Sequence, residues 1–249
     1  MTSPVIEQFE IHSLSAPLFT LAGQPVAFTN SALYMFLAVA AAVALVWGAM
    51  RPQALVPGRW QMLAELLYKM VADIVESAAG EKARPFFPFV FTVFIFVLCC
   101  NFLGMIPHSF TVTSHLVVNM FLALFLFVMI TFIGIYKHGY HFFSMFIPKG
   151  VPWWLAPLLF VIEVVSFLVR PFSLSVRLFA NMLAGHILLK VFAGMTASLA
   201  VAGWWAPLGG LPLALNVGIT GFEFFVAMLQ AYIFAVLTSV YLRDALELH

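Results

Sequence analysis

The chain has 249 residues, of which 64% are hydrophobic and 8% are charged, with a net charge of +1 and a mean hydropathy of +1.07. Soluble domains carry about 25% charged and about 45–50% apolar residues, so this composition excludes an ordinary water-soluble protein. A net charge near zero offers no basic face for nucleic acid, and the adjacent Cys99 and Cys100 predict neither a disulfide framework nor a metal site.

The first thirty residues form a polar, turn-rich segment. They contain Glu7, Glu10 and Pro17, and no basic stretch precedes an apolar core as it does in a cleavable signal peptide. We therefore expect residues 1–30 to be a tail outside the membrane. The first apolar helix is then the insertion signal.

Five apolar stretches follow, and each is long enough to cross a bilayer core of about 30 Å, which requires about 20 apolar residues. They are residues 31–50, 86–106, 114–136, 155–198 and 212–246. No internal repeat is visible along the chain. The predicted fold class is therefore an all-α integral membrane protein with one domain, residues 1–249.

Residues 57–80 differ from the five spans because their polar and apolar side chains fall on two faces. Leu63, Leu67 and Val71 recur at helical spacing, while Lys69 and Asp73 fall on the other face. We interpret this segment as an amphipathic helix that lies on the inner membrane surface. A connecting helix that packs on the rest of the protein fits the same pattern.

Basic residues are distributed unevenly between the spans. The N-terminal tail and the loops 107–113 and 199–211 contain no Lys or Arg. The basic residues between spans or near the C-terminus are Arg51, Arg59, Lys69, Lys82, Arg84, Lys137, Lys149 and Arg243. The positive-inside rule therefore predicts the N-terminus outside and the C-terminus inside, which agrees with five spans.

The last two spans are longer than a bilayer requires. At 1.5 Å per residue, residues 155–198 would extend about 65 Å and residues 212–246 about 50 Å. Helices of this length must tilt, bend or protrude, and Pro171 can kink the first of them. We expect both helices to be steeply tilted, as they would be if they crossed a curved partner.

The two long helices also carry ionisable residues inside the membrane. They are Glu163, Arg170, Arg177, His186, Lys190 and Glu223. A charge at the bilayer centre costs at least about 2.5–3.5 kcal/mol, so such residues have a partner, line a cavity or serve the function. The alternative is that these six residues only hold one helix against another through ion pairs or hydrogen bonds, which we call stapling.

On each long helix the polar residues recur every seven positions and therefore share one face. The first set is Glu163, Arg170 and Arg177, and the second set is Asn216, Glu223 and Gln230. Because the two helices are antiparallel, His186 and Glu223 should meet at a similar depth toward the outside. Glu163 lies toward the inside of Arg177.

This arrangement predicts two polar half-paths separated by a fixed cation. The outer path offers His186 and Glu223, which can both exchange protons. The inner path contains Glu163, Ser166 and Ser173. Arg177 remains protonated in a protein and cannot relay a proton, so conduction needs a moving partner with its own acidic group.

Small residues recur at helical spacing on both long helices. They are Ala227, Ala231 and Ala235 on the last helix, and Ala180 and Ala184 on the one before it. Such a pattern permits close approach of helices. It suits either a partner helix or packing within the chain.

Three stretches resemble the family of ATP synthase subunit a. The first is Pro171-Phe-Ser-Leu-Ser-Val-Arg177-Leu-Phe-Ala-Asn181-Met-Leu-Ala-Gly185-His186. The others are Asn101-Phe-Leu-Gly-Met-Ile-Pro107-His-Ser-Phe and Gln230-Ala-Tyr-Ile-Phe. The likeness covers most of the chain beyond the tail, and the order of His186 before Glu223 is that of mitochondrial and related bacterial forms, the alphaproteobacterial ones included.

The resemblance implies a stator proton-channel subunit of F-type ATP synthase, which is not catalytic alone and needs no cofactor or metal. Arg177 is then the essential arginine that faces a carboxylate of the rotating c-ring, with Asn181 and Gln230 beside it. The implied outer half-channel contains His186, Glu223 and Asn119. The implied inner half-channel contains Glu163, and the residues add Ser166 and Ser173.

The implied partners are the c-ring, the peripheral stalk subunit b, the other ATP synthase subunits and membrane lipid, with no nucleic acid. The implied location is the bacterial inner membrane, with the mitochondrial inner membrane as the alternative. Two other functions stay open at this point. A secondary transporter would favour internal repeats, and an intramembrane enzyme would use His186 and Glu223 as an acid–base pair, although no metalloprotease motif is present.

Overall fold

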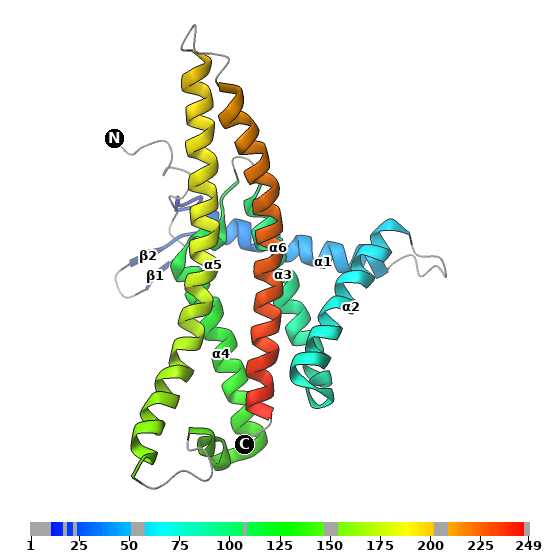
Figure 1. Ribbon diagram of the computed structural model, residues 1–249, viewed down its shortest axis with the longest axis vertical. Helices are drawn as coiled ribbons and strands as arrows, with labels where there is room; N and C mark the ends of the chain where they lie inside the picture. The colour runs from blue at the N-terminus through cyan, green and yellow to red at the C-terminus, as the bar shows by residue number, and fades with distance from the viewer. Residues whose placement is uncertain are drawn as a thin grey trace. The chain divides into compact units, whose positions relative to one another are not determined.

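The computed structural model describes residues 11–16, 19–21, 24–50, 58–106, 109–146, 154–201 and 209–246. Its α-helices are α1 Asn30–Met50, α2 Arg59–Ala79, α3 Phe87–Gly104, α4 Leu116–His138, α5 Ala156–Ala200 and α6 Gly210–Leu246 (Figure 1). Within the described residues, a 3₁₀ segment follows each of α2, α3 and α4. These segments are η2 Glu81–Phe86, η3 Val112–Ser114 and η4 Gly139–Phe146. The all-helical membrane fold is confirmed.

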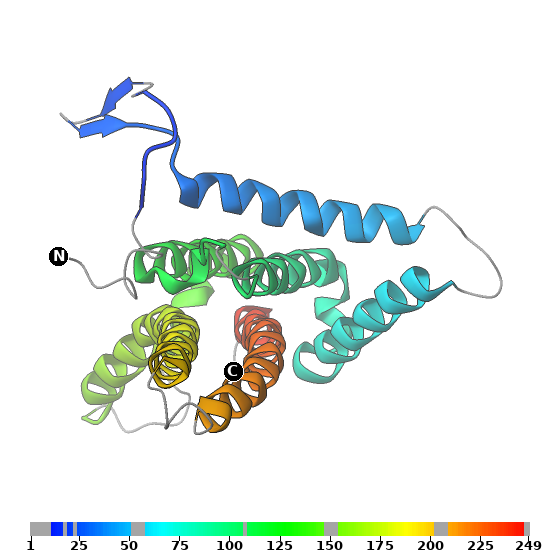
Figure 2. The same cartoon turned by 90° about the horizontal axis from the view of Figure 1, so that it is seen from above.

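A short antiparallel hairpin precedes α1 and was not predicted. Strand β1 spans Phe19–Leu21 and β2 spans Gln24–Val26 (Figure 2). The Leu14 N–H donates to the Phe28 carbonyl oxygen over 2.7 Å and extends the pairing toward α1. The predicted tail therefore contains regular structure, while residues 1–10, with Glu7 and Glu10, and Pro17 lie outside the described residues.

Five helical segments are long and apolar enough to cross a membrane. They are Asn30–Ala49, Glu81–Gly104, Leu116–Phe142, Ala156–Ala200 and Gly210–Leu246. These segments confirm the five predicted spans. Helix α5 has 45 residues and continues through Pro171, and α6 has 37 residues, so the last two helices are long, as expected. Their tilt against the bilayer stays a prediction.

The chain divides into two compact units, and each is described by itself. Unit 1 comprises residues Met1–Val43, Phe96–His115 and Leu178–Gln230. Unit 2 comprises residues Ala44–Ile95, Leu116–Arg177 and Ala231–His249. The helices α1, α3, α5 and α6 contribute residues to both units.

The core of unit 2 joins α4, η4 and the end of α6. Ile130, Phe142 and Ala245 are buried there, and the side chains of Phe167 and Tyr241 pack against them. A Cβ at Gly134 would overlap the Phe142 ring, so a larger residue here would force this ring to shift. This core joins α4 and η4 to Phe167 of α5 and to the C-terminal part of α6.

One face of helix α2 is buried within unit 2. Its buried residues are Leu67, Val71, Ile74, Val75 and Ala79, whereas Trp60, Met62, Leu63 and Leu66 remain exposed. Gly80 adopts a positive φ of 72°, which glycine tolerates, and thereby ends the helix before η2. The predicted amphipathic helix exists and packs on the protein, and its place on the inner membrane surface stays a prediction.

Several sequence predictions fall on residues that the structure does not describe. They concern the basic residues Arg51 and Lys149 and the Pro107–His108 part of the second family motif. Cys99 and Cys100 are buried within α3 as free thiols.

Candidate functional site

In unit 1 the second half of α5 and the first half of α6 run antiparallel beside each other (Figures 1 and 2). A Cβ at Gly185 would overlap the Glu223 carboxylate, so this acid lies directly against the backbone of α5. His186 is the next residue of α5. His186 and Glu223 therefore lie at one level of the unit, as their spacing along the helices predicts, and each is only 8% exposed.

His186 is held by a threonine from the segment between α3 and α4. The Thr111 hydroxyl donates to the Gly104 carbonyl oxygen over 3.2 Å, and Thr111 Oγ1 lies 3.1 Å from His186 Nε2. In the tautomer that carries its proton on Nε2, the ring donates to Oγ1 while the hydroxyl donates to Gly104. Thr111 thus orients the imidazole.

Further buried polar groups surround this pair. The Asn101 Nδ2 group donates to the Ala227 carbonyl oxygen over 3.1 Å, one turn along α6 from Glu223. Asn101 Oδ1 and Glu223 Oε2 are buried and find no protein partner among the described residues. Native proteins satisfy such atoms with water. Asn101, Thr111, His186 and Glu223, hereafter the polar cluster of unit 1, are therefore suited to hold water and exchange protons.

His115 lies at the end of this loop and outside the spans. Its ring stacks on Phe110 with centroids 5.0 Å apart, and partial burial lowers the pKa of the His115 imidazole. It lies between η3 and α4, at the end of the loop.

In unit 2 Arg170 of α5 forms an ion pair with an acidic residue of α6. Arg170 Nη1 lies 2.8 Å from Asp244 Oδ2, and its guanidinium lies over the Tyr241 ring at 5.0 Å and the Phe167 ring at 5.7 Å. We call Arg170, Asp244, Tyr241 and Phe167 the arginine clamp. Arg170 therefore forms an ion pair between α5 and α6, as the stapling alternative expects.

Asp244 was missed in the sequence, although a signal was available. It follows Gln230 by fourteen residues and therefore continues the seven-residue stripe of α6. The position seven residues after Gln230 is Leu237, an apolar residue that interrupts the stripe. Extending the count to the end of the helix would have placed Asp244 on the polar face.

Arg177 and Asn181 are exposed on α5, and so are Ser166 and Ser173. Glu163 is half-buried. Within the described part of unit 2, no carboxylate pairs with Arg177. The structure thus gives the stripe of α5 an exposed cation on the surface of the isolated chain.

The other predicted site residues are buried. Gln230 is 3% exposed with its Oε1 atom unpaired among the described residues, and Asn119 on α4 is 1% exposed. Ala227, Ala231 and Ala235 are fully buried, so this stripe packs within the chain rather than against a partner. Ala180 and Ala184 on α5 are exposed.

Comparison with known proteins decides the family. Residues 32–243 match the family described as ATP synthase A chain. The chain is 54% identical over 242 residues to ATP synthase subunit a of Methylobacterium sp. (strain 4-46), which covers 97% of this chain and 96% of the relative. It is 49% identical over 249 residues to ATP synthase subunit a of Rhodospirillum rubrum, over 100% of both chains. The chain belongs to the ATP synthase subunit a family.

Membership of the subunit a family confirms the resemblance seen in the sequence. The chain is the proton-channel stator subunit of Fo, a multi-pass membrane protein that is not catalytic alone and works with other ATP synthase subunits. The alternatives of a secondary transporter and an intramembrane enzyme are set aside. A third relative, from Pelagibacter ubique, is 47% identical over 249 residues and 100% of both chains.

Proposed function

We propose that this subunit gives protons access to the c-ring through two offset half-channels that Arg177 separates. The outer half-channel contains His186, Glu223 and Asn119. The inner half-channel contains Glu163, Ser166 and Ser173. We assign Asn181 and Gln230 to the region beside Arg177, where the exposed Asn181 hydrogen-bonds the ring carboxylate and the buried Gln230 holds water.

The exposed position of Arg177 is the observation that carries this proposal. Its neighbours Val169, Phe172 and Val176 are exposed apolar residues at 52%, 57% and 37%. A guanidinium stays protonated, and a permanent charge on an apolar surface at mid-span is costly unless a counter-charge covers it. An ionised carboxylate on a neighbouring c-ring supplies that counter-charge.

In this proposal a proton moves from the outer half-channel to the ring and from the ring to the inner half-channel. A proton from the outside passes through Glu223 and His186 and neutralises a c-ring carboxylate. The neutral carboxyl can enter lipid because its desolvation cost has dropped. After nearly a full turn of the ring it reaches the inner path near Glu163 and releases the proton.

Arg177 attracts the ionised carboxylate between these two events and blocks direct passage of protons. Each charge that crosses the membrane is worth about 2.3 kcal/mol per 100 mV. Asymmetric access of the two half-channels converts this energy into rotation. Because the ring exerts torque on the stator, the peripheral stalk subunit b must hold this subunit in place.

The proposed location is the bacterial inner membrane, with the N-terminus outside and the C-terminus inside. The basic residues Arg59, Lys69, Lys82, Arg84 and Arg243 support this orientation by the positive-inside rule. Helix α2 then lies on the inner membrane surface. The lengths of α5 and α6 suit a steep tilt across the curved ring.

The test replaces Arg177 in the intact ATP synthase. We expect Arg177→Ala to abolish ATP synthesis and ATP-driven proton pumping in membrane vesicles while the complex still assembles. Arg59→Ala, which removes an exposed arginine at the start of α2, is the matched control and should leave both activities unchanged. Retained pumping by the Arg177→Ala complex would refute the proposal.

A second measurement tests the role of the ring. Liposomes with this subunit and the c-ring should conduct protons, whereas liposomes with this subunit alone should not. Proton conduction without the ring would mean that Arg177 does not separate the two paths.

A further inference from the structure

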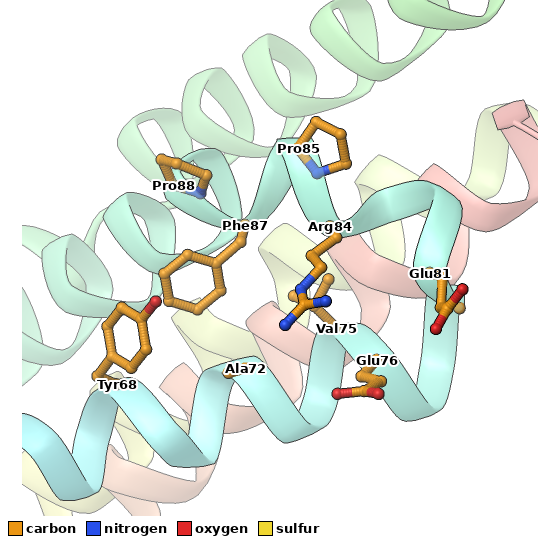
Figure 3. Close-up of a pocket in the computed structure, with 10 residues that line it drawn as sticks. Tyr68, Ala72, Val75, Glu76, Glu81, Arg84, Pro85, Phe87 and Pro88 are labelled. Carbon is orange, nitrogen blue, oxygen red and sulfur yellow. The ribbon is translucent and has the colours of Figure 1, made fainter.

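A cavity of about 410 Å³ lies in unit 2 between α2 and the η2–α3 turn (Figure 3). Arg84 points from η2 toward α2, with the carboxylates of Glu76 and Glu81 on one side of it. The rings of Tyr68 and Phe87 lie on the other side. The cavity therefore has a charged end and an aromatic end.

The three charged side chains at this cavity are exposed and not paired with one another. No hydrogen bond or ion pair within the described residues joins Arg84 to Glu76 or Glu81. Side chains of opposite sign that line one cavity without meeting leave room for a group that contacts both. A group that carries both signs of charge can contact both kinds of side chain at once.

The position of the cavity relative to the candidate membrane spans also indicates what it can bind. The candidate span Glu81–Gly104 begins at its wall, so we place the cavity near the membrane surface. Phospholipid headgroups occupy this zone. On the adjoining helix α2, Trp60 is 73% exposed and Leu66 is 55% exposed, as expected for side chains that contact the membrane interface.

We propose that this cavity binds the headgroup of one zwitterionic phospholipid of the phosphatidylethanolamine type. Arg84 pairs with the phosphate through its fork of N–H donors. Glu76 and Glu81 accept hydrogen bonds from the ammonium group. The glycerol and the first methylene groups lie along Tyr68 and Phe87, whose ring centroids are 4.6 Å apart.

Charge complementarity favours this occupant over the other candidates. One guanidinium and two carboxylates face the cavity, so an anionic headgroup such as phosphatidylglycerol would meet two repelling charges. A basic segment of a partner subunit would pair with the carboxylates but would face the like charge of Arg84. A phosphate with an ammonium two carbons away satisfies all three side chains.

The test uses the intact ATP synthase in nanodiscs that contain phosphatidylethanolamine, phosphatidylcholine and phosphatidylglycerol in equal amounts. Native mass spectrometry then counts the lipids that stay bound to the subunit after the complex is released from the nanodiscs. We expect phosphatidylethanolamine to be retained about tenfold over phosphatidylglycerol, which corresponds to about 1.4 kcal/mol. Phosphatidylcholine, which has the same charges but no N–H donor, should be retained less than phosphatidylethanolamine.

Variants locate the retained lipid. Arg84→Gln and Glu76→Gln should each lower retention about tenfold, and Arg84→Lys should keep part of it because the charge remains without the fork geometry. Asp73→Asn is the matched control, because Asp73 is exposed on the same helix and does not line this cavity. It should retain lipid as the unmodified complex does.

A further variant separates loss of the lipid from loss of folding. Ala72→Phe fills the cavity without a change of charge, and it should displace the lipid while ATP-driven pumping shows that the complex is intact. Equal retention of phosphatidylglycerol, or unchanged retention by Arg84→Gln, would overturn the proposal. So would a density map of the complex in which another subunit's polypeptide fills the cavity.

Discussion

The ionisable residues of α5 and α6 have different partners in the two units. In the polar cluster of unit 1, Glu223 is buried without an ion pair among the described residues, and His186 is hydrogen-bonded to a hydroxyl. In the arginine clamp of unit 2, Arg170 is ion-paired with Asp244 and stacked on Tyr241. A charge fixed by its counter-charge staples two helices, whereas a buried acid without one is free to exchange its proton.

Glu223→Gln should have the largest effect on this contrast. The amide keeps the size of the side chain but cannot exchange a proton, and such exchange contributes about 10²–10⁴-fold to proton-transfer rates. We expect ATP-driven proton pumping in membrane vesicles to fall about 100-fold or more. The complex should still assemble.

Glu65→Gln serves as the control, because Glu65 is exposed on α2 and bonded to Gln61. It should pump normally. If the Glu223→Gln complex pumped at more than half the normal rate, the polar cluster of unit 1 would be a structural feature like the arginine clamp.

Gly185→Ala should have the next largest effect. The added methyl group would overlap the Glu223 carboxylate, so either the carboxylate or one of the helices must move. We expect pumping to fall about tenfold, which corresponds to about 1.4 kcal/mol in the barrier. Glu223→Asp, which shortens the acid, should recover part of the loss when it is combined with Gly185→Ala.

Gly194→Ala gives the matched control on the same helix. A Cβ at Gly194 meets no atom within 4 Å, so this change should leave pumping intact. If Gly194→Ala impaired pumping as much as Gly185→Ala, the loss would reflect the helix backbone and not the contact with Glu223.

The sequence predicted the parts of this contrast that depend on periodicity. The seven-residue stripes and the antiparallel direction of the helices put His186 and Glu223 at one level, which the contact of Gly185 with Glu223 confirms. The five spans were predicted because long apolar runs have few other interpretations.

The rest depends on contacts between distant parts of the chain. Thr111 and His186 are 75 residues apart, and no local pattern in a loop indicates a bond to a helix. The stripe of Ala227, Ala231 and Ala235 permitted a partner or internal packing, and only burial decides between them. The hairpin of β1 and β2 has three residues per strand, too few for a period-two pattern.

Thr111→Val should have a smaller effect, because it removes a hydrogen bond but no charge. His186 Nε2 and the Gly104 carbonyl oxygen lose their shared partner, and an unpaired buried group costs about 1–3 kcal/mol. We expect pumping to fall about three- to tenfold, with Thr111→Ser close to normal because it keeps the hydroxyl.

A double-mutant cycle separates orientation of His186 from general stability. If Thr111 acts through the imidazole, Thr111→Val should add little to the loss caused by His186→Ala. Additive losses from the two changes would contradict the orienting role of Thr111.

Asp244→Asn should have the smallest effect on pumping and should act on stability instead. The side chains of Arg170 and Asp244 are 23% and 32% exposed, so solvent screens the pair in part, and we expect a loss of roughly 1–2 kcal/mol. The measurement is the thermal stability of the purified complex, together with pumping at a temperature where the variant is folded. Asp73→Asn, at an exposed position of α2, should change neither quantity.

Variants of the arginine clamp also test whether Arg170 and Asp244 stabilise the fold without exchanging protons. In a staple, the Arg170→Gln and Asp244→Asn changes together should cost less stability than the two single changes added, because neither charge is left alone. Pumping should stay near normal throughout. If Asp244→Asn abolished pumping in a complex of normal thermal stability, Asp244 would exchange protons as Glu223 does, and the arginine clamp would belong to the proton path.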